Sequence, residues 1–341
     1  MSLLPRCFRQ GSPAGPARQA SLPRRCRYGG GVISFLALCL PIFAVIGVGW
    51  AAAWRGAITP AMVDAVGSFS FLFALPALLL RLMASQPLGR SFDPGFFLGY
   101  LGACLAVFAL VMAAALPFRR RAPAAAIGAA AAMGNVGYLG PPLLLPLLGE
   151  RGAGPIAMSI MSEVAVVLAL GSVLMAPGAG LRTMGRVGRI LIRNPVLLSI
   201  GGGALLGAAA IPLPGPVERF LGFLGGAAGP TALFALGGTL ARLRIDRRLL
   251  AVASGAVAAK LLLYPLVVWL VLGQALGLAP VWVQSGVLLA AMPTATNAFV
   301  LAQRNQAATD EVSAVVLFST LIATFAFPVT AWLVAPPVAL P

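Results

Sequence analysis

The chain has 341 residues, of which 60% are hydrophobic and 9% are charged, and its mean hydropathy is +0.97. So few charged side chains cannot cover a soluble globule, and the composition therefore indicates a polytopic helical membrane protein. The formal net charge of +16 could suggest nucleic-acid binding. Because the arginines are spread over loops beside apolar segments, membrane topology and anionic lipid account for them, and we expect lipid contact and no nucleic-acid partner.

The first 28 residues are rich in Arg, Pro, Gly and Ser, a bias typical of a disordered basic tail. Two origins stay open: an extension from an upstream start site, or a twin-arginine or secretory signal in which Arg24 and Arg25 precede an apolar run. We favour the extension, because the apolar run is long enough to remain as a membrane span and has a counterpart in the second half of the chain.

Ten apolar segments follow, each close to the roughly 20 residues that a helix needs to cross a bilayer. Five occupy residues 32–176 and five occupy residues 195–334, with an arginine-rich loop at 177–194 between the two sets. The first set is Val32 to Trp54, Ala61 to Met83, Gly95 to Phe118, Pro123 to Leu148, and Pro155 to Ala176; the second is Pro195 to Ile211, Val217 to Ala241, Leu249 to Leu276, Val281 to Ala302, and Val312 to Val334. Because each set has an odd number of spans, the second half is expected to be inverted relative to the first.

The connections between these spans differ in arginine content. We number each connection by the span that it follows. The even-numbered connections, with the span ends beside them, contain only four arginines: Arg81, Arg90, Arg151 and Arg219. The odd-numbered connections contain many more: Arg55, Arg119, Arg120, Arg121, Arg182, Arg186, Arg189, Arg193, Arg242, Arg244, Arg247, Arg248 and Arg304. Since short cytoplasmic loops retain positive charge, we expect the odd connections in the cytoplasm and both termini outside.

The fourth and ninth segments are interrupted near their middles. The runs are Ala131-Ala132-Met133-Gly134-Asn135-Val136-Gly137-Tyr138-Leu139-Gly140-Pro141-Pro142 and Ala290-Ala291-Met292-Pro293-Thr294-Ala295-Thr296-Asn297-Ala298-Phe299. The shared Ala-Ala-Met begins at 131 and again at 290, an offset of 159 residues, which is near half the chain. Glycine, proline and asparagine inside lipid free backbone groups that only protein or a water-filled cavity can satisfy. Such breaks at matching positions of two halves indicate a transporter's central binding site.

A broken helix exposes amides on one half and carbonyls on the other, so it can bind a carboxylate without a fixed positive charge. Asn135 and Asn297 are predicted to add side-chain amides, which donate to a carboxylate and accept from a protonated group. Thr294 and Thr296 are candidates to add hydroxyl groups. The alternative is that these polar side chains satisfy the freed backbone, and for each threonine the two interpretations stay balanced.

Four further residues complete the predicted substrate-binding set. Pro141, Pro142 and Pro293 differ from the other prolines of the spans, most of which kink or end helices, in having polar neighbours, and Pro141 and Pro293 are included in the set. Gly137 belongs to the same interrupted run. Tyr138 is a candidate to close over a substrate, although an aromatic ring beside a kink more often serves packing.

Two charged residues lie deep inside predicted spans. Glu163 is eight residues past Pro155, about 12 Å along its helix, and Lys260 is twelve residues past Arg248, about 18 Å along. Charges at that depth face a partner or a cavity. We interpret Glu163 as a proton carrier, and Lys260 as its partner or as an aid to anion access; a structural ion pair is the alternative for both.

The sequence has no feature of the common catalytic or metal sites. It lacks histidine, which excludes His-based triads and His-coordinated zinc, and it has no phosphate-binding loop or Gly-x-Ser-x-Gly element. Its four cysteines show no metal-ligand spacing or disulfide framework. We therefore expect no cofactor, no metal and no enzymatic activity.

From about Val32 to the C terminus, the chain resembles the auxin efflux carrier family, which includes plant auxin exporters and bacterial carriers for malonate, malate and related acids. The resemblance rests on the two interrupted runs, on Arg193-Asn194-Pro195 and on Lys260-Leu261-Leu262-Leu263-Tyr264-Pro265. It implies two inverted five-helix repeats with crossed broken helices, a fold similar to sodium/proton antiporters and bile acid carriers. It also implies an inner-membrane secondary transporter of organic anions and a homodimer formed through its scaffold.

The leading hypothesis is therefore a carrier that moves a small organic anion, a mono- or dicarboxylate, by alternating access coupled to protons or sodium. A channel or a non-transporting sensor on the same scaffold is the alternative. A membrane enzyme is disfavoured, because no nucleophile and base pair or metal cluster lies in a plausible membrane cavity.

Overall fold

The computed structural model describes residues 32–85, 92–175, 192–242 and 249–334, together with residues 185, 188 and 189. The expected basic tail at 1–28 lies outside the described residues, as does most of the expected loop at 177–194. Residues 30–338 group as one unit, and the description below concerns this unit alone.

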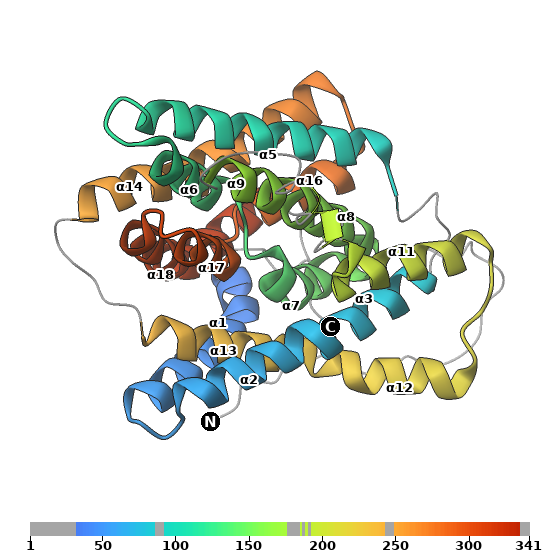
Figure 1. Ribbon diagram of the computed structural model, residues 1–341. Coiled ribbons are helices and arrows are strands. Elements are labelled where there is room, and N and C mark those ends of the chain that lie inside the picture. The colour runs from blue at the N-terminus through green and yellow to red at the C-terminus, as the bar shows by residue number, and fades with distance from the viewer. Residues whose placement is uncertain are drawn as a thin grey trace, which may run out of the picture. The chain divides into compact units, whose positions relative to one another are not determined.

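The described residues are almost entirely helical (Figure 1), as the composition predicted. The first half contains α1 (Val32–Trp54), α2 (Pro60–Phe69), the π-helical turn Ser70–Ala74, α3 (Leu75–Ala84), α5 (Pro94–Ala115), α6 (Arg121–Ala132), α7 (Val136–Leu148), the 3₁₀ turn Gly149–Gly152, α8 (Ala153–Ile160), the π-helical turn Met161–Val167 and α9 (Leu168–Met175). The second half contains α11 (Pro195–Ala208), α12 (Gly215–Gly226), α13 (Ala228–Leu240), α14 (Leu250–Ala258), the π-helical turn Ala259–Leu263, α15 (Tyr264–Trp269), the π-helical turn Leu270–Ala275, α16 (Pro280–Ala290), α17 (Thr296–Arg304) and α18 (Thr309–Val334).

Several helices begin where the sequence supplies a capping side chain followed by proline. The side chains of Thr59, Asp93 and Asn194 accept hydrogen bonds from backbone N–H groups in the first turns of α2, α5 and α11. Proline follows each of them, at a position where its missing N–H leaves no intrahelical bond unmade. The Asn194-Pro195 pair of the family resemblance is thus the start signal of a helix.

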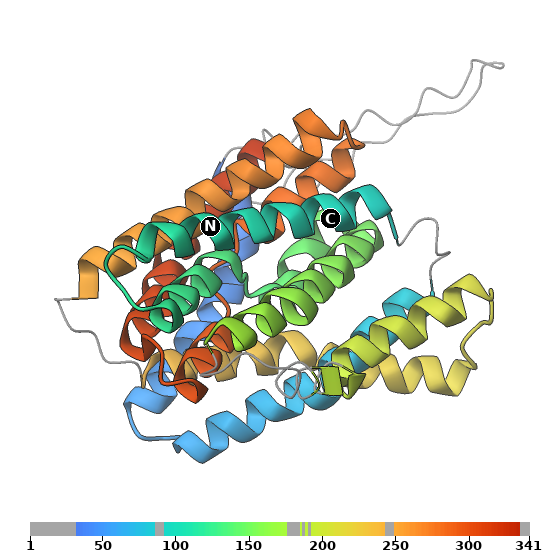
Figure 2. The same ribbon diagram turned by 45° about the horizontal axis from the view of Figure 1, so that its top comes forward.

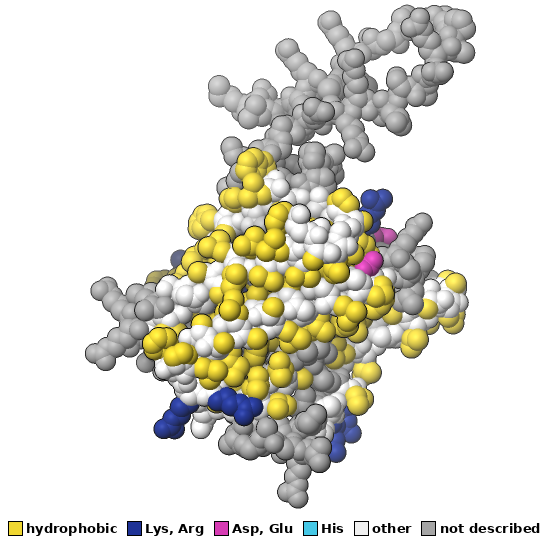
Figure 3. Space-filling view, turned by 90° about the horizontal axis from the view of Figure 1, so that it is seen from above, with side chains coloured by type: hydrophobic (Ala, Val, Ile, Leu, Met, Phe, Trp, Pro, Cys, Tyr) yellow, Lys and Arg dark blue, Asp and Glu magenta, His cyan; other side chains and the backbone are white. Residues whose placement is uncertain are grey.

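Five continuous helical segments among the described residues are long and apolar enough to cross a membrane. They are Pro60–Ala84, Pro94–Ala115, Gly215–Leu240, Val252–Ala275 and Thr309–Val334. Three shorter apolar helices are Leu40–Trp54, Pro195–Ala208 and Pro280–Ala290. Large apolar side chains such as Phe118 and Phe223 point outward, being 83% and 89% exposed. Figure 3 shows hydrophobic side chains across the viewed face and Lys and Arg at its margins, which fits an integral membrane protein.

The helices pack in two groups; in Figure 2, the lower layer contains α2, α3, α11, α12 and α13, and α1 runs upward from it behind the other group. In one group α13 packs on α1 and α2, and α3 packs on α11 and α12. In the other, α6 packs on α5 and α9, α18 packs on α14 and α17, and α15 packs on α16. Contacts of α1 with α18 and of α13 with α7 join the groups. The two interrupted segments, α6–α7 and α16–α17, both belong to the second group.

Two glycines allow α1 and α13 to approach backbone to backbone. A Cβ atom on Gly237 would overlap the Ile46 carbonyl, and one on Gly49 would overlap the Phe234 carbonyl. Small residues of this kind let membrane helices approach closely, where van der Waals contact replaces the hydrophobic effect. α13, which lines the cavity described below, is therefore held firmly against α1.

Candidate functional site

The two interrupted segments touch at their breaks. The Asn135 N–H donates to the Pro293 carbonyl at 2.8 Å, and the Ala295 N–H donates to the Met133 carbonyl at 3.0 Å. These bonds form one isolated antiparallel bridge between Gly134 and Thr294. Backbone groups that each break removes from its own helix are thus satisfied by the other break, as irregular backbone inside a membrane protein requires.

A small cavity of about 30 Å³ lies where α7 and α17 begin. It is lined from α7 by Val136, Gly137 and Tyr138, which follow Asn135, and from α17 by Thr296 and Asn297. No side chain caps the first turn of either helix. Two positive helix ends with free N–H groups therefore converge on one cavity, an arrangement that favours an anion.

The polar side chains at this cavity include atoms without protein partners. Asn135 is only 4% exposed, and its Nδ2 has no hydrogen-bond partner among the described residues. The Thr296 hydroxyl is likewise buried and unpartnered within that part of the chain. Asn297 is half-buried and lines the same cavity. A buried donor without a partner is costly, so these groups are suited to a ligand.

The structure separates the two threonines that the sequence analysis treated alike. The Thr294 hydroxyl donates to the Ala130 carbonyl at 2.9 Å, and the Thr294 N–H donates to Ser319 Oγ at 3.0 Å. Thr294 thus satisfies backbone of α6. Pro293 contributes its carbonyl to the bridge, and Pro141 is buried within α7; neither lines the cavities described here.

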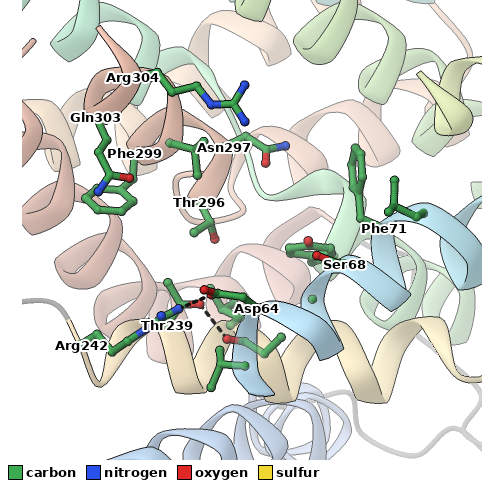
Figure 4. A pocket seen from close by; sticks show the side chains of 17 residues that line it. Asp64, Ser68, Phe71, Thr239, Arg242, Thr296, Asn297, Phe299, Gln303 and Arg304 are labelled. Atoms are coloured by element: carbon green, nitrogen blue, oxygen red, sulfur yellow. Dashed lines mark hydrogen bonds and ion pairs between the residues drawn. The ribbon is translucent and has the colours of Figure 1, made fainter. Parts of the chain in front are cut away.

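A larger cavity of about 790 Å³ adjoins the small cavity at the beginnings of α7 and α17 (Figure 4). Its walls come from α2 and the π-helical turn after it, from α13, and from α7 and α17, so that both helix groups contribute. Tyr138, Thr296 and Asn297 line both cavities and connect them. The outer part carries an ion pair between Arg242 and Asp64 at 2.7 Å, and Arg304 at the end of α17.

Glu163 and Lys260, the buried charged residues in the described part of the chain, both lie near the first break. Glu163 is 1% exposed and lines the small cavity, and its Oε1 accepts a hydrogen bond from the Tyr100 hydroxyl at 2.8 Å. Lys260 is fully buried; its Nζ donates to the Ala290 carbonyl at 2.8 Å and lies 4.4 Å from the centroid of the Tyr264 ring. The ammonium group thus meets the negative end of α16 and an aromatic face, both of which favour a cation.

Gly134 lies close to both of these charges. A Cβ atom there would be 3.2 Å from both Glu163 Oε1 and Lys260 Nζ. No direct ion pair joins the two residues in the part of the chain that the structure describes. Glu163 Oε2 has no partner there either. Both charges sit on π-helical turns, Met161–Val167 and Ala259–Leu263, which are frequent at functional sites.

Sequence reasoning missed three contributors to this region. Tyr100 was not singled out, although a tyrosine deep in an apolar span needs a hydrogen-bond partner, and only four tyrosines occur in the chain. Ser319 supports the second break from α18, and Asp64 neutralises Arg242 from α2. A lone serine in an apolar span and an aspartate near a helix start carry no sequence signal that names these partners.

An apolar helix bundle in which two broken helices meet beside a polar cavity is the architecture of a membrane transporter. The sequence profile of a family described as membrane transport protein matches residues 34–331. The chain therefore belongs to the auxin efflux carrier family, as the interrupted runs suggested.

Two relatives agree with this assignment. A protein of Rhizobium meliloti (strain 1021), provisionally named a malonate transporter, is 36% identical over 299 residues, covering 84% of this chain and 91% of the relative. A protein of Methanothermobacter thermautotrophicus (strain Delta H), named an uncharacterized transporter, is 31% identical over 207 residues, covering 58% of this chain and 64% of the relative.

Proposed function

We propose that the protein is a secondary transporter that carries a small organic anion, a carboxylate, across the bacterial inner membrane by alternating access. The substrate site is the cavity at the beginnings of α7 and α17, with Asn135 and Asn297 as the principal side-chain donors. Transport is coupled to protons through Glu163; sodium is the alternative coupling ion.

One observation carries this proposal: two uncapped helix N-termini and the unpartnered Asn135 amide surround the same cavity. Each element favours an anion through N–H donors, and together they offer a carboxylate several charge-assisted hydrogen bonds without a cation. The name of the R. meliloti relative agrees with a carboxylate substrate.

Coupling to protons follows from the position of Glu163 in the wall of the anion cavity. An ionised Glu163 repels a carboxylate nearby, whereas a protonated Glu163 does not. Binding of a proton at Glu163 and of the anion therefore strengthen each other, and by linkage the effect is reciprocal. The unpartnered Oε2 is the oxygen available to take the proton. Lys260, held at the end of α16, offsets part of the charge when Glu163 ionises.

The architecture proposed with this function is two inverted five-helix repeats whose broken helices cross. The bridge between Gly134 and Thr294 supports it, because these residues are 160 positions apart, one residue from the 159-residue offset between the two halves. The large cavity opens beside Arg242 and Arg304, both on the side predicted to be cytoplasmic, so we infer a state open to the cytoplasm. Termini outside and a homodimer remain predictions from the sequence.

The test is counterflow in proteoliposomes loaded with a series of small carboxylates, using wild type, Asn135→Ala and Asn297→Ala. We expect saturable exchange by the wild type, and each variant to bind about tenfold to a hundredfold more weakly, because each loses a charge-assisted bond of about 1.5–3 kcal/mol. Thermal unfolding of the purified variants controls for folding. Variants that keep wild-type affinity would refute the site, and non-saturable flux without counterflow would indicate a channel.

A further inference from the structure

Helix α17 lines the large cavity along much of its length, from its first turn to its last residue. Thr296 and Asn297 lie at its beginning, Val300 lies one turn on, and Arg304 is the final residue. Arg304 follows Asn297 by seven residues, about 10.5 Å along the axis, and so lies on the same helix face. Helical side chains lean toward the N-terminus, and Figure 4 shows the Arg304 side chain extending toward Asn297.

The charges lining this cavity do not cancel. Its charged lining residues are Asp64, Arg242 and Arg304. Asp64 holds Arg242 at 2.7 Å, so the charge of Arg242 is neutralised. Arg304 forms no ion pair within the described part of the chain. One positive charge thus remains available in the cavity, above the site that we assign to a carboxylate.

We propose that Arg304 binds the second carboxylate of a short dicarboxylate whose first carboxylate is held at Asn135, Asn297 and the helix N-termini. This inference rests on the proposed function and narrows the substrate to diacids. A guanidinium group presents paired N–H donors that match a carboxylate bidentately, whereas Asn297 offers a single amide. Because both groups project from one helix, their spacing selects diacids by length.

Arg304→Gln in the purified full-length protein tests this assignment. Binding of malonate, succinate and glutarate is measured by calorimetry beside that of acetate and propionate, and each ligand is then used for counterflow. We expect the best diacid to bind at least tenfold more weakly to Arg304→Gln, while the two monoacids change by less than about twofold. Arg304→Lys keeps the charge but loses the paired donors, and should fall between the two.

Arg55→Gln is the matched control, because Arg55 is an exposed arginine on the same predicted side and lines neither of the two cavities described. It should leave binding of diacids unchanged. Three outcomes would overturn the role of Arg304 and leave the proposed transport intact. Arg304→Gln could lose equal affinity for diacids and monoacids, or it could lose no affinity for diacids. The third outcome is a wild type that binds monoacids more tightly than diacids. A wild type that binds and exchanges no carboxylate would overturn the proposed function itself, and this inference with it.

Discussion

The two helix breaks are joined by the same backbone bridge, yet their surroundings differ. The first break, at Gly134 and Asn135, has Glu163 beside it, whereas Lys260 lies near both breaks and donates to the Ala290 carbonyl at the end of α16. At the second, Thr294 is tied to neutral partners, Ala130 and Ser319, and Asn297 follows at the large cavity. Under the proposed function, this difference gives the breaks two roles: the first places Glu163 beside the bound substrate, and the second lies at the cavity through which substrate enters.

The largest effect that can test these two roles is expected at Glu163. Glu163→Gln keeps the shape of the side chain but cannot ionise, so exchange of substrate should persist while uphill accumulation driven by a pH gradient disappears. Both are measured in the same proteoliposomes, with and without an imposed gradient. Survival of pH-driven accumulation would show that protons do not couple through the first break, and sodium would become the better hypothesis.

The next effect is expected at Gly134, where a methyl group would meet both buried charges. Gly134→Ala puts a Cβ atom 3.2 Å from Glu163 Oε1 and Lys260 Nζ and 3.3 Å from the Leu289 carbonyl, which is tight for such contacts. We expect a loss of about 1–3 kcal/mol in stability and an altered pH dependence of transport.

Gly140→Ala is the control for Gly134→Ala, because Gly140 lines neither of the two cavities described. A Cβ atom there would meet Ile156 Cγ2 at 3.5 Å and Leu289 Cδ2 at 3.7 Å, which are ordinary contacts. Thermal unfolding and pH profiles of the two variants are compared. If both behave as wild type, the packing around the first break is looser than the structure indicates.

The smallest effects should distinguish the threonines of the second break. Thr294→Val removes a hydroxyl that bonds to the Ala130 carbonyl, and it should lower stability by about 1 kcal/mol. Thr296→Val removes an unpartnered hydroxyl, so stability should hold while substrate affinity falls a few-fold. Unfolding temperature and binding affinity are measured for both. The opposite pattern would reverse the roles that the structure gives them.

Much of the helical arrangement could be predicted from the sequence, because it follows from apolar runs and from residues that start or stop helices. The predicted interruptions coincide with the ends of α6 and α16 and the beginnings of α7 and α17. Helix ends were less accurate. α5 ends at Ala115 and not at Phe118, because Pro117 has no N–H with which to continue the helical hydrogen bonds. α11 ends at Ala208 and not at Ile211, and Ala210 adopts a left-handed φ of 52°.

The contacts of the candidate site could be predicted only in part. Glu163 and Lys260 were recognisable because charges are rare in apolar spans, and the asparagines because they lie at breaks. Three contacts depend on tertiary structure: Gly134 lies close to both charges, Tyr100 donates to Glu163, and the Thr294 hydroxyl, unlike that of Thr296, bonds to backbone. A single sequence shows which polar groups need hydrogen-bond partners when buried, but not which residues the fold brings beside them.

The backbone bridge between the breaks also sets the distance between two helix N-termini. Its two hydrogen bonds, Asn135 to Pro293 and Ala295 to Met133, hold the starts of α7 and α17 at a set separation. Under the proposed function, the width of the site for a carboxylate is therefore set by the main chain, which substitution of side chains hardly alters. Selection for bulkier anions would have to change side chains that line the large cavity, such as Phe71 and Leu72. Relatives with larger substrates should thus differ first in the segment that follows α2.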